Sequence, residues 1–297
     1  MSDFVQQQNS ICGFNSSDSW VILSPIEQSI KRKIEAVGTP LKDWDIQINY
    51  GIKTGFNDAF IISTEKRNEI LTNCKDVDER QRTEELIRPI LRGRDIKRYG
   101  YVDNGLYLIN THNGIRGRIP RIKIEDYPAV KAHLDQYWDR IATRADKGDT
   151  PYNLRNCAYL EDFSRPKIIW KRIGSILRFS FDNKGCLGLD STCFAAGEHI
   201  EYLCCVLNSL MGHYLLKDSP KTGTGDLLVS VQAIEPAHIP YNAQYDRQLS
   251  SLLGQQITNP SNSTEKEIND IVFTMYGLSP NEREYVTQYV KLSQQSL

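Results

Sequence analysis

The sequence predicts an α+β protein, with a strand-rich body in the middle of the chain and helices toward both ends. Short apolar runs bounded by glycine, asparagine or aspartate recur between residues 44 and 182, which is typical of strands. Apolar residues at helical spacing fill residues 24–38 and 198–217. From Asp246 onward the chain is polar and helical, without strand signals. Strands and helices thus occupy separate parts of the chain, as they do in α+β proteins.

Three parts of the chain differ in character: a polar leader at residues 1–20 that we expect to be flexible, an α/β body at residues 21–240, and a helical region at residues 241–297. The polar start contains no signal peptide, and the seven cysteines are odd in number and irregular in spacing. We therefore expect reduced thiols in a cytoplasmic protein. No apolar run approaches the length of a membrane span, so no membrane partner is expected.

The first element of the body is an amphipathic helix over "LSPIEQSIKRKIEAVG", residues 23–38. Ser24 fits the N-cap, Pro25 the first helical position and Glu27 the capping-box position. Gly38 is the expected stop. The apolar face of the helix carries Ile26, Ile30, Ile34 and Val37.

The rest of the body alternates strands and helices. Residues 79–101 predict a charged helix, a turn at Gly93 and then a strand. Further strands are predicted over residues 44–55, 57–63, 105–110, 165–173 and 176–182. Further helices are predicted over residues 127–146 and 198–217, and two more over 263–290, with Ser263 and Ser279 as caps.

Several kinds of active site lack their motifs. "GTGD" at residues 223–226 has neither the spacing of a P-loop nor that of a dinucleotide fingerprint, and "SPKTGTGDL" is interpreted as a mobile surface turn. No Asn/Asp-Pro-Pro-Tyr/Phe tetrapeptide of adenine methyltransferases occurs, and neither Cys-x-x-Cys nor His-x-x-x-His is present. We therefore assign no catalytic residue, no metal site and no cofactor to this chain.

A magnesium-dependent nuclease is an alternative reading of the sequence. Such enzymes often carry a carboxylate followed two residues later by lysine, and Asp95 with Lys97 and Asp182 with Lys184 fit that triplet. The triplet is common by chance, and no Glu-x-Lys occurs in the chain.

Charge is distributed unevenly along this near-neutral chain. Residues 82–123 carry ten Lys/Arg against four Asp/Glu, and residues 165–178 carry five basic residues and no acids. From Glu235 onward seven acids face four bases. A basic body with interleaved aromatic, His and Asn side chains suits a polyanion such as DNA, because Arg and Lys contact phosphates and Arg, Asn and Lys read base edges. The alternative is a solvated charged face.

Six segments in order resemble the TaqI-like C-terminal specificity domain, the target-recognition part of adenine-N6 DNA methyltransferases and of fused type IIG restriction–modification enzymes. The segments are "INYGIKTGFNDAFIIS", "IRPILRGRDIKRY", "YLINTHNG", "YPAVKAHLDQYWDRIATRADKGDTPYNLRNCAYLEDFSRPKIIWKRI", "EYLCCVLNSLMGHYLL" and "EKEINDIVFTMYGLSPNERE". The resemblance covers nearly all of the chain from about residue 21. It implies a domain that binds double-stranded DNA and selects its sequence. A separate methyltransferase domain, in cis or in trans, would bind S-adenosylmethionine, and fused members also carry a nuclease domain.

The resemblance turns the basic loops into DNA-binding candidates. In the loop after residue 50, Lys53 would contact phosphate, and Thr54 and Asn57 phosphate or base. In "LRGRDIKRY" we expect Ile96 to pack inward and Asp95 to orient a neighbouring arginine. Strand alternation places Lys171 and Arg172 on opposite faces, so at least one of them should face solvent or DNA. The remaining candidates are Arg92, Arg94, Lys97, Arg98, His112, Asn113, Arg116, Lys221 and Thr222.

A second reading from another class is a protein-interaction or regulatory module that does not bind DNA. The helices fit either reading, because they would brace the body against a catalytic partner or simply complete the hydrophobic core. Salt-dependent binding to DNA separates these two classes.

Overall fold

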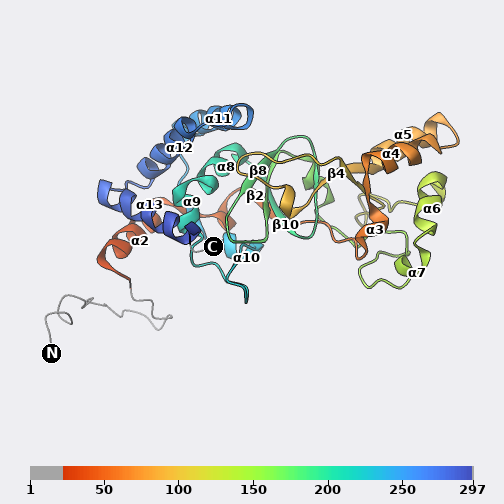
Figure 1. Ribbon diagram of the computed structural model, residues 1–297, viewed down its shortest axis with the longest axis horizontal. Coiled ribbons are helices and arrows are strands. Elements are labelled where there is room, and N and C mark those ends of the chain that lie inside the picture. Colours follow the sequence, from red (N-terminus) through yellow and green to blue (C-terminus); the bar gives the residue numbers. More distant parts are fainter. Residues whose placement is uncertain (1–22, 296–297) are drawn as a thin grey trace.

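The computed structural model describes residues 23–295, so the predicted leader at residues 1–20 lies outside the described residues. The described chain has an α+β fold, as predicted (Figure 1). The helices are α2 (Pro25–Val37), α3 (Asn57–Phe60), α4 (Thr64–Thr72), α5 (Val77–Leu86), α6 (Pro128–Asp135), α7 (Trp138–Ile141), α8 (Ile200–Asn208), α9 (Leu210–Leu215), α10 (Val231–Ile234), α11 (Ala243–Thr258), α12 (Asn262–Met275) and α13 (Pro280–Gln295). The strands are β1 (Thr39–Pro40), β2 (Ile46–Tyr50), β3 (Ile61–Ser63), β4 (Ile87–Leu91), β5 (Leu106–Ile109), β6 (Lys167–Lys171), β7 (Ile173–Gly174), β8 (Phe179–Asp182), β9 (Leu187–Gly188), β10 (Thr192–Gly197), β11 (Leu227–Leu228) and β12 (His238–Ile239).

The central sheet has the strand order β2-β10-β6-β8 and is antiparallel throughout. A second sheet has the order β3-β5-β4-β9, in which β4 and β9 run parallel. Two short pairs, β1 with β12 and β7 with β11, complete the strand pairing. In Figure 1 the central sheet lies between the helices α2, α9 and α11–α13 on the left and the lobe of α3–α7 on the right.

The central sheet separates two hydrophobic cores. Along β10, Cys193 and Ala195 face one core, whereas Phe194 and Ala196 face the other. The first core includes buried residues of α2, α8, α9 and α11–α13, and the second includes the second sheet and residues of α3, α4 and α6. Because both faces of the sheet are covered at its centre, the successive residues Ile168, Ile169 and Trp170 of β6 are all apolar and buried, whereas the edge strands β2 and β8 alternate apolar and polar residues. The domain boundary between residues 240 and 241 remains a prediction.

The helix α2 has the predicted capping box. Ser24 Oγ accepts a hydrogen bond from the backbone of Glu27, and the Glu27 carboxylate accepts one from the Ser24 backbone N–H at 2.9 Å. Gly38 ends the helix as expected. Ile30 is fully buried, but Val37 is exposed, so the apolar face is buried at its middle rather than along its whole length.

Two predicted strands differ from the structure: the strand predicted over residues 57–63 is shortened to β3, and the strand predicted after Gly93 is absent. Residues 57–60 form the helical turn α3, because Thr54 Oγ1 accepts from the Phe56 N–H at 3.2 Å and donates to Asn57 Oδ1 at 2.6 Å, which bends the chain before β3. No strand follows the turn at Gly93, because Tyr99 has a left-handed backbone with φ of 69°.

Two predicted helices are each divided into two, and one cap is shifted. The helix over 198–217 breaks at Ser209, which caps α9 by accepting from the Gly212 N–H at 3.1 Å. The helix over 127–146 is divided into α6 and α7. The cap of α12 is Ser261, which accepts from the Thr264 N–H at 3.0 Å, and not Ser263. Among residues 23–295, none of the helices has the length and apolar character needed to cross a bilayer.

Candidate nucleic-acid interface

The predicted basic segments converge at one end of the central sheet. The last residues of β2 and β6, Tyr50 and Lys171, pair with Cys193 and Thr192 at the start of β10. The last residue of β4, Leu91, pairs with Gly188. The segments that follow these three strands therefore emerge together around the turn that leads into β10. We call this region the sheet end, defined as residues 51–54, 92–94, 171–174 and 188–192.

Backbone contacts hold the sheet end together. Ile52 donates to the Gly188 carbonyl at 2.6 Å, and the Arg172 N–H donates to the Ser191 carbonyl at 3.0 Å. Glycine allows two close approaches, one to the backbone and one to a lysine side chain. A Cβ on Gly51 would lie 2.0 Å from the Leu189 carbonyl oxygen, and a Cβ on Gly93 would lie 2.9 Å from Lys171 Cγ. These contacts explain the glycines that begin the Lys53 loop and the turn before Arg94.

The opening loop contributes one exposed cation. Lys53 is 49% exposed and forms an ion pair with Asp146 at 2.7 Å. A hydrogen bond from Lys53 is the main reason why the pKa of Asp146 is lowered. Thr54 is only 2% exposed and bonded to Asn57, so its side chain shapes the loop, whereas Asn57 is exposed.

The four cations in the loop after β4 have two different roles; they are Arg92, Arg94, Lys97 and Arg98. The Arg92 guanidinium makes two hydrogen bonds to the buried Asp95 carboxylate, which confirms that Asp95 orients a neighbouring arginine. Burial opposes ionisation of Asp95, but the hydrogen bonds from Arg92 outweigh it and keep its pKa below the usual value. Ile96 is buried, as predicted. Arg94 and Lys97 are exposed, and within residues 23–295 neither has an acidic partner.

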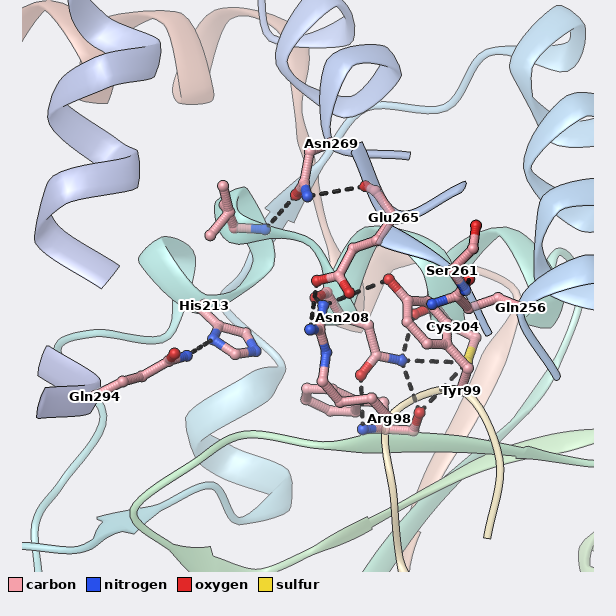
Figure 2. A network of polar contacts seen from close by, with 12 residues as sticks. Arg98, Tyr99, Cys204, Asn208, His213, Gln256, Ser261, Glu265, Asn269 and Gln294 are labelled. Atoms are coloured by element: carbon pink, nitrogen blue, oxygen red, sulfur yellow. Dashed lines mark hydrogen bonds and ion pairs between the residues drawn. The ribbon is translucent and has the colours of Figure 1, made fainter. Parts of the chain in front are cut away.

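Arg98 faces the helices instead of the surface (Figure 2). Its guanidinium donates to the Asn208 carbonyl at 2.6 Å and forms an ion pair with Glu265 of α12. The guanidinium carbon also lies 5.3 Å from the centroid of the Tyr99 ring. Of the four cations in this loop, the structure thus presents Arg94 and Lys97 outward and engages Arg92 and Arg98 in internal contacts.

The strand end at Lys171 and the loop at Lys221 lie next to each other. Lys171 is exposed, so at least one of the two basic residues faces solvent, as strand alternation predicted, while its neighbour Trp170 is buried in the first core. The half-buried Arg172 accepts a hydrogen bond at its carbonyl from the Val229 N–H at 2.9 Å. Lys221 is bridged to Leu227 of β11, which pairs with β7. The loop that carries Lys221 and Thr222 is thereby attached to the sheet end.

A basic hairpin lies apart from the sheet end. Ile115 and Ile119 form an antiparallel β-bridge in this hairpin. Arg116, Arg118 and Arg121 line a pocket with a volume of about 940 Å³. Arg118 pairs with Glu161 and Arg121 with Asp149, whereas the exposed Arg116 has no acidic partner among the described residues.

The two polar candidates before the hairpin have local roles. Asn113 donates to Asp149 at 3.0 Å and accepts from the Asp149 N–H at 2.9 Å, which holds the hairpin against residues 146–158. His112 Nδ1 accepts from the Gly114 N–H at 3.1 Å, and burial lowers the pKa of this histidine. His112 is therefore neutral at physiological pH and adds no positive charge to the hairpin.

Two residues of this region were absent from the sequence predictions. Asp190 and Ser191 are the central residues of the turn that the Thr192 N–H closes on the Leu189 carbonyl at 2.8 Å. Ser191 Oγ accepts from the Gly93 N–H at 3.1 Å, and Asp190 has no ion-pair partner among residues 23–295. The only local signal was the turn-forming pair Asp-Ser after an apolar run.

The carboxylates of both nuclease-like triplets are engaged in structural contacts. Asp95 binds Arg92, and the fully buried Asp182 binds the Lys167 ammonium at 2.5 Å. In the part of the chain that the structure describes, no group of three or more His, Cys, Asp or Glu side chains is arranged to hold a metal ion. Neither triplet therefore presents an open carboxylate.

Comparison with known proteins identifies the fold. No family model matches the chain. The chain is similar to part of the type IIL restriction–modification enzyme MmeI, solved in complex with DNA, with a TM-score of 0.61, 12% identity, and coverage of 88% of this chain and 36% of that chain. It is also similar to part of the type IIG restriction endonuclease BpuSI, with a TM-score of 0.50, 14% identity, and coverage of 91% of this chain and 32% of that chain. The chain spans about a third of either protein and shares its fold with that portion of restriction–modification enzymes.

Proposed function

We propose that this chain is a sequence-specific DNA-recognition domain of a restriction–modification system, of the TaqI-like specificity type, and that the sheet end contacts the duplex. The observation that carries the proposal is the convergence of the segments after β2, β4 and β6 around one turn. Fold similarity to portions of two restriction–modification enzymes supports it.

The charges at the sheet end fit a polyanion. Arg94, Lys171 and Lys221 are exposed and have no acidic partners within residues 23–295. Lys53 is half-exposed and pairs with Asp146. The Asp146 carboxylate also pairs with Arg155, with 3.3 Å between Asp146 Oδ1 and Arg155 Nη1. Cations that are free of internal partners gain most from neutralising phosphates, because each contact releases condensed counterions from DNA. The exposed Lys97 adds to this surface, and the hairpin with Arg116 provides a second, separate basic surface.

Catalysis belongs to a separate domain in this proposal. A methyltransferase domain, in cis or in trans, would bind S-adenosylmethionine and methylate adenine, and a nuclease domain would accompany it in fused systems. This chain would select the sequence and hold the duplex for that partner.

The proposal is tested by DNA affinity as a function of salt concentration. We expect the observed binding constant of the wild-type chain to fall linearly on logarithmic axes, with a slope of about −0.9 for each phosphate contacted. Lys171→Ala and Lys221→Ala should each make this slope shallower. Lys266→Ala on α12 is the matched control, because it removes an exposed lysine without an ion-pair partner among residues 23–295 from the helical region and should leave the slope unchanged. Absence of binding even at low salt would favour the protein-interaction reading.

A further inference from the structure

We propose that Arg98 is a positioning residue that fastens the DNA-facing loop to α8 and α12, so that the outward presentation of Arg94 and Lys97 depends on the Arg98–Glu265 ion pair. The inference rests on the proposed DNA-binding function. It assigns Arg98, predicted from the sequence as a DNA contact, a different role.

The backbone on both sides of Arg98 is bound to β8. The Lys97 N–H donates to Ser180 Oγ at 3.1 Å, and the Tyr99 N–H donates to the Phe179 carbonyl at 2.9 Å. The Phe181 N–H donates in turn to the Tyr99 carbonyl at 2.8 Å. Tyr99 has a left-handed backbone, which is unfavourable for a residue with a large side chain and persists only where its surroundings impose it.

The side chain of Arg98 supplies those surroundings from the helical side. Its two partners are the carbonyl of Asn208, the last residue of α8, and the carboxylate of Glu265 in the first turn of α12. The Asn208 side chain donates to the Phe179 carbonyl at 2.7 Å and accepts from the Phe179 N–H at 3.1 Å. The end of α8, the strand β8 and the loop are therefore joined at one point (Figure 2).

A second asparagine ties α12 into the same network. Asn269 Oδ1 accepts from the Leu210 N–H at 2.7 Å, at the break between α8 and α9, and Asn269 Nδ2 donates to the Glu265 carbonyl at 2.9 Å. The helix that carries Glu265 is thus held against the break between α8 and α9 (Figure 2). A displacement of α12 would therefore move the partner of Arg98 and, with it, the loop that carries Arg94 and Lys97.

The charge of Arg98 is paired with an acid, whereas the charges of Arg94 and Lys97 are not. The Arg98 and Glu265 side chains are 32% and 28% exposed, so water does not fully screen the pair, and its charges neutralise each other. Arg94 and Lys97 keep their charges free for phosphate. A phosphate contact by Arg98 would require it to leave Glu265, whereas a positioning role requires the pair to remain intact when DNA binds.

A phosphate contact by Arg98 and a positioning role predict opposite effects of Glu265→Gln. If Arg98 contacts phosphate, the substitution should tighten DNA binding, because it frees Arg98 from Glu265. If Arg98 positions the loop, Glu265→Gln and Arg98→Ala should each weaken binding to the selected sequence about tenfold, and the double variant should be no weaker than either single variant. The slope of affinity against salt should stay at the wild-type value in all three. Glu267→Gln, an exposed acid on the same helix, is the matched control and should leave affinity unchanged.

A readout without DNA separates this inference from the proposed function. Hydrogen exchange of the amides of residues 97–101 should be faster in Glu265→Gln and Arg98→Ala than in the wild type and in Glu267→Gln. Faster exchange in a chain that binds no DNA would contradict the proposed function but leave the role of Arg98 in holding the loop intact. Unchanged exchange, tighter DNA binding by Glu265→Gln, or a shallower salt slope for Arg98→Ala would overturn the positioning role. If Arg98→Ala fails to fold, the isosteric Glu265→Gln variant alone still decides between the two.

Discussion

The guanidinium of Arg92 and the carboxylate of Asp95 meet in a two-point contact, with Nε–Oδ2 at 3.0 Å and Nη2–Oδ1 at 2.9 Å. The carboxylate also accepts from the Arg92 backbone N–H and from Asn104 Nδ2, both at 2.8 Å. Arg92 is thereby committed to holding its own turn, while Arg94, two residues further on, stays free. Two arginines in one short loop thus have separable roles.

Removing these two arginines should give contrasting phenotypes. Arg94→Ala should make the slope of DNA affinity against salt shallower by about 0.9 and change the free energy of unfolding by less than about 0.5 kcal/mol. Arg92→Ala should lower the free energy of unfolding by about 1–3 kcal/mol, because it leaves the Asp95 carboxylate buried without its main partner. Urea denaturation and salt titration measure both quantities. A stability loss in Arg94→Ala as large as that in Arg92→Ala would contradict the assignment.

The buried pair of Lys167 and Asp182 should govern stability rather than DNA binding. Both side chains are inaccessible to solvent, and Asp182 also accepts from the Tyr101 hydroxyl at 2.9 Å. Asp182→Asn should lower the free energy of unfolding by about 3–5 kcal/mol, because it leaves a buried ammonium without its counter-charge. Lys184→Ala, two residues along the chain, is the matched control and should be nearly neutral. Equal stability of Asp182→Asn and wild type in urea denaturation would show that the pair does not stabilise the fold.

Glu282 should make stability depend on pH in the acid range. Its carboxylate is 6% exposed and joins α13 to α2, accepting from Ser29 Oγ at 2.7 Å and Lys33 Nζ at 2.6 Å. Burial opposes its ionisation, but these hydrogen bonds and one from the Ser279 N–H lower its pKa from 4.5 to about 2. A carboxylate with a lowered pKa in the folded state stabilises the fold above the unfolded-state pKa, and that contribution is lost as the pH falls through the folded-state pKa. The stability difference between wild type and Glu282→Gln should therefore shrink as the pH falls from about 4.5 toward 2. A pH-independent difference in unfolding free energy would contradict this assignment.

Asp190 is the negative charge at the sheet end, so its removal should strengthen general DNA binding. The carboxylate lies in the turn surrounded by the segments of Lys53, Arg94 and Lys171 and has no ion-pair partner in the described chain. Asp190→Asn should bind non-specific duplex more tightly at low salt, with the gain fading at high salt because screening weakens the lost repulsion. Asp270→Asn on α12 is a charge-matched control and should leave affinity unchanged. Equal effects of the two variants would place the DNA away from the sheet end.

Local signals in the sequence predicted the elements whose partners are close along the chain. The capping box of α2 depends on residues three positions apart, and the role of Asp95 depends on Arg92 at the same spacing. Both were predictable because their hydrogen bonds are local. The residues of β10 include small side chains with weak strand preference, and this central strand was missed because its stability comes from pairing with β2 and β6.

The roles of the basic residues depended on contacts distant in sequence. Arg98 and Lys97 look equivalent in "RGRDIKRY", yet Arg98 meets Glu265, more than 160 residues away, while Lys97 is exposed. Lys53 was likewise a candidate from its own loop, but its ammonium pairs with Asp146, which follows α7. Pattern and charge predicted which loops are basic and not which side chains within them have internal partners.

The most direct test of the DNA-recognition account is binding selection from a random duplex library at moderate salt, with the wild-type chain and Arg94→Ala in parallel. If the chain recognises a DNA sequence, the wild type should enrich a motif of a few base pairs containing adenine, and Arg94→Ala should bind more weakly. Binding without enrichment would show a basic surface that does not read bases unaided, contrary to the claim of sequence recognition by this chain. Absence of binding by the wild type, even after the salt is lowered, would contradict the DNA-recognition function itself.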